Sequence, residues 1–256
     1  MKYFVFFIAL FPWLLWSSEV KPLWLQGEKL NYTISWGFIT AGTALMEVRP
    51  LADGKTEIWS FARNNGLFEQ IYPVADTVYS RMRNEEFLPE VFKKTLHEGS
   101  YHNKSVIRFD RAGGKAWLSD TVFTDPVKRK IKRSTDTVIA ITGWERCILT
   151  AFYLVRTMDL EVGKETRFSA VSGKKRYDLR VVVHSREKVK TDAGTFDCIK
   201  VEPILDGDGL FNASGRLFIW LSDDEKRLPV LMKSEITLGS IRAELTNFEL
   251  KLPAGK

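Results

Sequence analysis

The sequence predicts a mainly β protein, an antiparallel meandering barrel or strongly curved sandwich with one principal helix. Three observations predict it: apolar residues alternate with period two over most of the chain, turn residues separate these stretches at close spacing, and one segment changes to helical spacing. Of the 256 residues, 45% are hydrophobic and 27% are charged. This composition is typical of a packed protein and excludes disorder and disulfide-dense mini-proteins.

The amino terminus predicts export. Met1-Lys2 is a short positive start, residues 3–16 are an unbroken apolar run, and two serines follow it. The run contains Pro12 and is shorter than the about 20 residues that cross a bilayer, which favours a secretory signal peptide at 1–18 over an anchor. We therefore expect a periplasmic or secreted protein with no transmembrane span in the mature chain.

The first half of the mature chain is expected to form a series of short strands. In the first of them, Leu30, Tyr32, Ile34 and Trp36 share one face, and a glycine-bounded turn at 37–42 follows. Turn signals with paired small or acidic residues separate the later stretches. Further strands are expected at 43–48, 56–62, 74–83, 90–96, 101–109 and 115–118.

The change of period comes near the middle of the chain. Apolar residues from Trp144 to Val155 recur at helical spacing, and Thr142 stands three residues before Glu145, as in a capping box. These features predict a helix over about 143–158 that covers or plugs an open side of the sheet. Strands then resume at 165–171, 177–184, 187–191, 195–202, 215–222, 229–236 and 242–250.

We expect residues 19–256 to form a single β-rich domain. A basic run near 126–134 offers an alternative break between two β subdomains, with the run as the linker. We see no internal repeat in the sequence that would support this division.

Four blocks of sequence carry a family resemblance. They are 27–32 with 41–44, 150–156, 194–203, and 219–224 with 227–230. In this order, over nearly all of the mature chain, they resemble the exported bacterial family called domain of unknown function 3108. The resemblance implies an exported protein of antiparallel β architecture and carries over no reaction, cofactor or catalytic residue. The segment 219–232 is also similar, more weakly, to the outer-membrane lipoprotein carriers, whose curved half-barrels hold acyl chains.

Three tryptophans are candidate ligand-binding residues. Trp36, Trp59 and Trp220 fall at strand positions that face either the core or a ligand cavity. If they line a cavity, they would contact a lipid or glycan of the cell envelope.

A basic run is the candidate for contact with an anionic surface. It contains Lys128, Arg129, Lys130, Lys132 and Arg133, in a chain with a formal net charge of +6. The alternative interpretation is a solvated loop or strand with only Ile131 turned inward. Export argues against nucleic acid as the partner.

The cysteines and histidines leave their chemistry open. Cys147 and Cys198 form either a disulfide in an oxidising compartment or two buried thiols. His97 and His102 are expected to face each other across a hairpin turn at Gly99-Ser100. Because no third ligand is evident, we predict no metal site and no cofactor.

The residues together favour a non-enzymatic envelope protein. It would bind an apolar or amphipathic envelope component or scaffold its assembly, and a protein partner at an exposed edge strand is a further option. The alternative is a hydrolase acting on cell-wall or polysaccharide material with Asp223 and Asp224 near an aromatic groove. Adjacent residues of one strand end diverge, however, and do not supply paired carboxylates by themselves.

Overall fold

A computed structural model describes residues 21–205, 215–236 and 239–251. In these ranges the helices are η1 (Leu23–Gln26), α1 (Gly66–Ile71) and α2 (Ile148–Val155). The strands of the first half are β1 (Glu28–Trp36), β2 (Ile39–Pro50), β3 (Lys55–Asn64), β4 (Ala75–Arg83), β5 (Leu88–Glu98), β6 (Tyr101–Asp110), β7 (Lys115–Asp125) and β8 (Lys130–Ala140). Those of the second half are β9 (Glu165–Ser172), β10 (Lys175–Thr191), β11 (Gly194–Leu205), β12 (Leu217–Ser222), β13 (Pro229–Ile236) and β14 (Gly239–Leu250).

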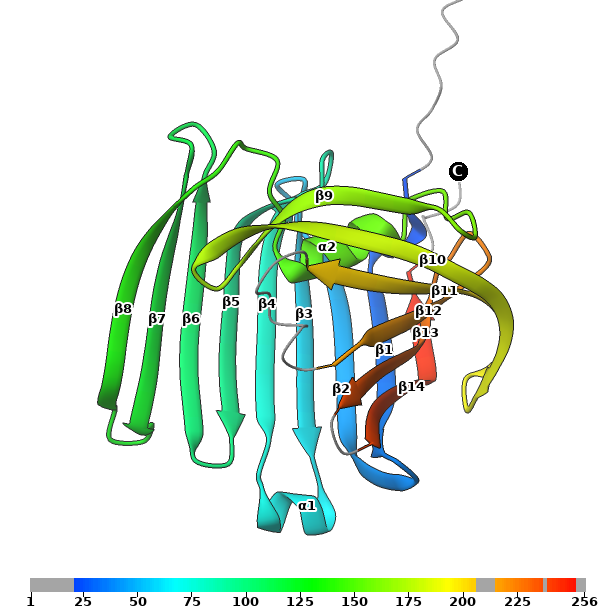
Figure 1. Cartoon of the computed structure of the whole chain (residues 1–256), viewed down its shortest axis with the longest axis horizontal. Helices are drawn as coiled ribbons and strands as arrows, with labels where there is room; N and C mark the ends of the chain where they lie inside the picture. The colour runs from blue at the N-terminus through cyan, green and yellow to red at the C-terminus, as the bar shows by residue number, and fades with distance from the viewer. Residues whose placement is uncertain (1–20, 206–214, 237–238, 252–256) are drawn as a thin grey trace, which may run out of the picture.

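All these strands belong to one antiparallel sheet. Its order is β8-β7-β6-β5-β4-β3-β2-β1-β14-β13-β12-β11-β10-β9. Strands that are neighbours in sequence therefore pair, except β8 and β9, which are the two edges of the sheet, and β1 also pairs with β14. Figure 1 shows β1–β8 as a curved wall and β9–β11 turned over its upper part, with α2 between them. The prediction of a mainly β meander with one principal helix is confirmed.

The core lies where the two parts of the sheet face each other across α2. Leu30, Tyr32, Met46 and Ile58 are buried on the inner face of the wall, where alternate residues point inward. A second apolar cluster joins Ala151 and Val155 of α2 to β10–β12. The helix thus has one face in each cluster.

The predicted helix bounds were wrong. The Glu145 carboxylate accepts hydrogen bonds from the backbone N–H of Thr142 (2.8 Å), as in a capping box, and of Gly143 (3.0 Å), but no helix starts at these residues. The next residue is held against β9, since Arg146 N–H donates to Ser169 O (3.0 Å). The helix therefore begins only after Cys147, whose backbone N–H donates to the hydroxyl of Thr150 (3.2 Å).

Two other expectations change in the structure. The segments 177–184 and 187–191 were expected as two strands but form one, β10, with a register shift between Val183 and Ser185. The basic run near 126–134 lies in the β7–β8 hairpin, whose strands pair from Lys115–Ala140 to Asp125–Lys130. Among the described residues, no helix is long and apolar enough to cross a membrane.

Candidate functional site

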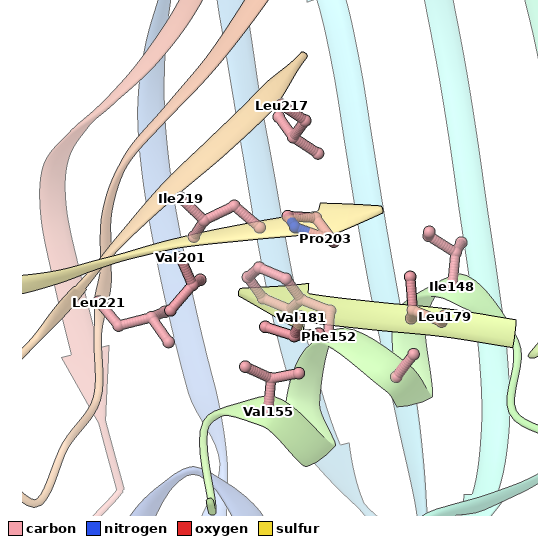
Figure 2. A pocket seen from close by; sticks show the side chains of 11 residues that line it. Ile148, Phe152, Val155, Leu179, Val181, Val201, Pro203, Leu217, Ile219 and Leu221 are labelled. Carbon is pink, nitrogen blue, oxygen red and sulfur yellow. The ribbon is translucent and has the colours of Figure 1, made fainter. Parts of the chain in front are cut away.

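An apolar cavity of about 100 Å³ lies between α2 and strands β10–β12. Figure 2 shows the side chains of α2 on one side of this cavity and those of the three strands on the other. All the lining residues have hydrocarbon side chains: Ile148, Ala151, Phe152, Val155, Leu179, Val181, Val201, Pro203, Leu217, Ile219 and Leu221. An interior surface of this kind offers no hydrogen bond, so only an apolar group can occupy it without a desolvation cost.

The sequence places these residues by simple periodicity. In β12, Leu217, Ile219 and Leu221 are two apart, so all three point to one face of the strand. In α2, Ile148, Ala151, Phe152 and Val155 follow the spacing i, i+3, i+4, i+7, which is one face of a helix. The two stripes face each other across the cavity because β9–β11 fold over the helix.

A more polar hollow of about 250 Å³ adjoins the cavity and shares Ile148 with it. Lys94, Lys174 and Asp120 are its charged lining residues. The Asp120 carboxylate already accepts hydrogen bonds from the side chains of Asn103 (2.9 Å) and Arg133 (3.4 Å). Two lysine ammonium groups thus line a hollow that lies next to a hydrocarbon cavity.

The opposite face of α2 holds a buried ion pair. The Arg156 guanidinium, just after the helix, donates to both carboxylate oxygens of Glu28 at 2.6 Å, and both side chains are fully buried. Tyr153 Oη donates to the same carboxylate (3.1 Å), and Arg156 also donates to the carbonyl of Arg227 (2.9 Å). Burial, reinforced by the Glu28 charge, raises the pKa of Tyr153 well above its usual value. These groups fill one another's hydrogen-bonding capacity and anchor the helix to β1.

The structure does not bring the three candidate tryptophans together, and none of them lines the cavity. Trp36 is exposed at the end of β1, and Trp59 stacks on Phe61 on the outer face of β3. Trp220 is buried on the face of β12 opposite the cavity, and its ring N–H donates to Glu187 (2.6 Å). Sequence reasoning chose the aromatic residue of β12, whereas the cavity uses the aliphatic residues on either side of it.

The basic run is exposed in the β7–β8 hairpin and in the first half of β8. β8 lies at an edge of the sheet. Ile131 is exposed as well, so the expectation that it turns inward was wrong. The reason is that at an edge strand near a hairpin tip no second layer covers either face.

Cys147 and Cys198 are both buried free thiols. The Cys147 thiol lies 3.4 Å from the Ser80 hydroxyl. Burial raises the pKa of the Cys147 thiol, and that of the Cys198 thiol to about 12. Both thiols are therefore protonated and unreactive at neutral pH.

His97 and His102 are a cross-strand pair, as predicted, with ring centroids 5.0 Å apart. Within the described ranges, no group of three or more potential ligands could hold a metal ion. Asp223 is engaged by Arg186 (2.7 Å) and Arg227 (3.0 Å), and Asp224 accepts from the Ser222 hydroxyl (2.6 Å). These two carboxylates thus serve the turn between β12 and β13 and do not face the cavity.

Three solved structures of low sequence identity align with most of the chain, and the first of them shares the fold. A β-barrel-like protein of the domain of unknown function DUF1849 from Brucella abortus aligns with a TM-score of 0.54 and 12% identity, covering 89% of this chain and 98% of that one. A candidate exported protein with a YmcC-like fold from Bacteroides fragilis aligns with a TM-score of 0.31 and 8% identity, covering 88% and 96%. A candidate lipoprotein from Parabacteroides distasonis aligns with a TM-score of 0.31 and 11% identity, covering 88% and 95%.

No curated protein is significantly similar in sequence. The model of the family "Protein of unknown function (DUF3108)" matches residues 31–246, which include almost all of the sheet and the whole of α2. The chain therefore belongs to the DUF3108 family.

Proposed function

We propose that the protein binds the alkyl end of an amphipathic molecule of the bacterial envelope, without catalysing a reaction on it. The observation that carries this proposal is the cavity between α2 and β10–β12, which is lined by hydrocarbon alone. The apolar leader at residues 1–18 supports export, which would bring the protein to the compartment where such molecules are abundant.

The size of the cavity limits what can enter it. Its volume of about 100 Å³ is smaller than the roughly 150 Å³ of an engineered apolar cavity that binds benzene. It therefore suits the last few carbons of a chain and not a whole acyl tail. The remainder of the ligand would lie outward, past Ile148.

The adjoining hollow suggests the chemistry of the other end of the ligand. Lys94 and Lys174 line this hollow, and it meets the cavity at Ile148. A ligand with an anionic head group would place its charge beside these lysines while its chain end occupies the cavity. Dodecanoate has this shape and is a suitable first probe.

Binding of dodecanoate to the exported protein is measured by isothermal titration calorimetry and native mass spectrometry. Ala151→Leu fills the cavity from the helix side and should weaken binding roughly tenfold, because space for about two methylene groups is lost. Ala52→Leu adds the same side chain at an exposed position of the β2–β3 turn, away from the cavity, and is the matched control.

The polar end is tested separately with Lys174→Ser. This variant should weaken dodecanoate binding and leave binding of uncharged dodecanol unchanged. If the unmodified protein binds neither probe, or if Ala151→Leu and Ala52→Leu bind dodecanoate equally well, the proposed site is wrong.

A further inference from the structure

One end of the curved wall exposes a concentration of large apolar side chains. In a meander of antiparallel strands, every second connection lies at the same end, so the β1–β2, β3–β4, β5–β6 and β7–β8 connections share one rim. Figure 1 shows these four connections, with α1 among them, at the lower edge of the molecule, and α2 lies nearer the opposite end. We call this end the turn rim.

Nine of the fifteen large hydrophobic residues exposed in the described ranges lie in or next to these four connections: Trp36, Phe38, Ile39, Leu67, Ile71, Tyr72, Tyr101, Val127 and Ile131. At the β1–β2 turn they include Phe38, which is fully exposed, and Ile39. The helix α1 buries none of its residues, and its Leu67 and Ile71 are about 70% exposed. Core packing therefore does not explain why these turns are apolar.

Hydrogen bonds join the turns into one continuous surface. Gly37 N–H donates to Ser240 O (3.1 Å), Asn65 N–H to Ala41 O (3.2 Å), and Gly99 N–H to Pro73 O (2.7 Å). Gly99 has a positive φ of 56° and lies so close to Tyr72 that an added Cβ would come within 2.5 Å of the ring. The β1–β2, β3–β4 and β5–β6 connections are thus held side by side.

The same rim continues into the basic hairpin. A hollow lined by His97, His102, Pro126 and Arg129 links the β5–β6 and β7–β8 ends. Beyond it, Val127 and Ile131 are exposed among the five basic residues at 128–133. Apolar and basic side chains therefore alternate at one end of the rim.

We propose that the turn rim is a docking surface for an anionic lipid membrane. Exposed Trp, Tyr, Phe, Leu and Ile side chains on a rigid edge suit the boundary between head groups and acyl chains, where aromatic residues are favoured. The basic residues complement the negative charge of the lipid head groups. The rim would hold the protein on the membrane surface without crossing it.

The test is flotation with vesicles of phosphatidylcholine alone and of phosphatidylcholine mixed with phosphatidylglycerol. Because residues 3–16 would themselves bind lipid, the protein is purified after export and its mass is measured to show that they are absent. We expect the unmodified protein to bind the mixed vesicles more tightly, and added salt to weaken this binding.

Two rim variants are compared with one control. Phe38→Ser with Leu67→Ser should lower the affinity for both kinds of vesicle by at least roughly tenfold, since about two large side chains no longer enter the interface. Lys130→Ser with Lys132→Ser should lower the affinity for mixed vesicles only, by roughly twenty-five-fold, at about fivefold for each basic residue. Trp144→Ser removes an exposed aromatic residue that follows β8, at the end of that strand opposite the turn rim. This variant should change the affinity for neither kind of vesicle.

These positions are exposed, so the variants should fold, and their circular dichroism spectra should match that of the unmodified protein. The proposal fails if the unmodified protein does not float, or if Trp144→Ser reduces flotation as much as the rim variants do. It also fails if analytical ultracentrifugation shows that the rim joins two copies of the chain and that Phe38→Ser with Leu67→Ser abolishes only this dimer.

Discussion

The two faces of α2 are buried in different ways. On the side of β1 and β4, Tyr153, Thr150 and Arg156 hold hydrogen bonds of defined length to Glu28 and to the backbone. On the side of β10–β12, the helix presents only hydrocarbon and leaves about 100 Å³ unfilled. Directional bonds fix the position of the helix on the first side, and this anchoring allows the second side to remain incompletely packed.

The largest effect should come from breaking the bonded face. Arg156→Met leaves the Glu28 carboxylate buried without its charge partner, which should lower the free energy of unfolding by about 3–5 kcal/mol. Urea unfolding followed by circular dichroism measures the loss. The double variant Glu28→Met with Arg156→Met removes both charges and should recover much of it. A double variant no more stable than the single one would mean that lost packing, and not an unpaired charge, causes the effect.

Shortening a side chain on the cavity side of α2 should lower the free energy of unfolding by less than Arg156→Met does. Leu221→Ala should lower the free energy of unfolding by about 2–3 kcal/mol, the lower part of the range for buried leucines, because Leu221 already borders empty space. Leu30→Ala, on the tightly packed inner face of β1, should cost about 3–5 kcal/mol in the same urea experiment. Equal losses at the two positions would contradict the difference in packing described above.

Removing the hydrogen bond at the start of α2 should lower the free energy of unfolding by a smaller amount. Thr150→Val keeps the volume of the side chain but removes the acceptor for Cys147 N–H, and should cost about 1 kcal/mol. Thr157→Val, which removes an exposed hydroxyl that donates to Leu154 O (2.7 Å), should cost under about 0.5 kcal/mol. Thermal unfolding of the two variants side by side measures the difference. A Thr150→Val variant as stable as the unmodified protein would show that the cap does not fix the start of α2.

The rate at which the two cysteines are alkylated measures their burial, and this experiment needs no substitution. Only the thiolate reacts with iodoacetamide. Burial raises the pKa of both thiols, that of Cys198 to about 12. The folded protein should therefore be alkylated slowly at pH 8, and the rate of alkylation should still increase as the pH is raised further. Mass spectrometry counts the adducts. In urea without reductant, two adducts should form quickly. A chain that accepts none until it is reduced would instead contain a Cys147–Cys198 disulfide.

Local sequence patterns predicted the strands well and the helix bounds poorly. Alternation identified the inner face of β1, because a strand's period is independent of what packs on it. The pair Thr142 and Glu145 has the spacing of a capping box, yet Arg146 pairs with β9, a strand that comes later in the chain, and this contact keeps the segment extended. No local rule includes such a contact.

The position of the apolar cavity could not be predicted from the sequence. Trp36, Trp59 and Trp220 were expected to face either the core or a ligand cavity, and none of the three lines the cavity. Both faces of β12 are buried, so the alternation around Trp220 could not show which face borders the cavity. The turn rim was missed for a related reason, since its apolar residues lie in connections far apart in sequence.

By itself, the sequence determined the local elements: short strands with period-two faces, one apolar helix, an apolar stretch at residues 3–16 and a basic run at 128–133. These depend on side-chain periodicity and turn chemistry, which act over a few residues. Only the tertiary structure decided that β9–β11 fold over α2, that Glu28 meets Arg156 across 128 residues, and that four turns form one rim. Such contacts depend on how the whole sheet curves, which is a collective property of all its strands.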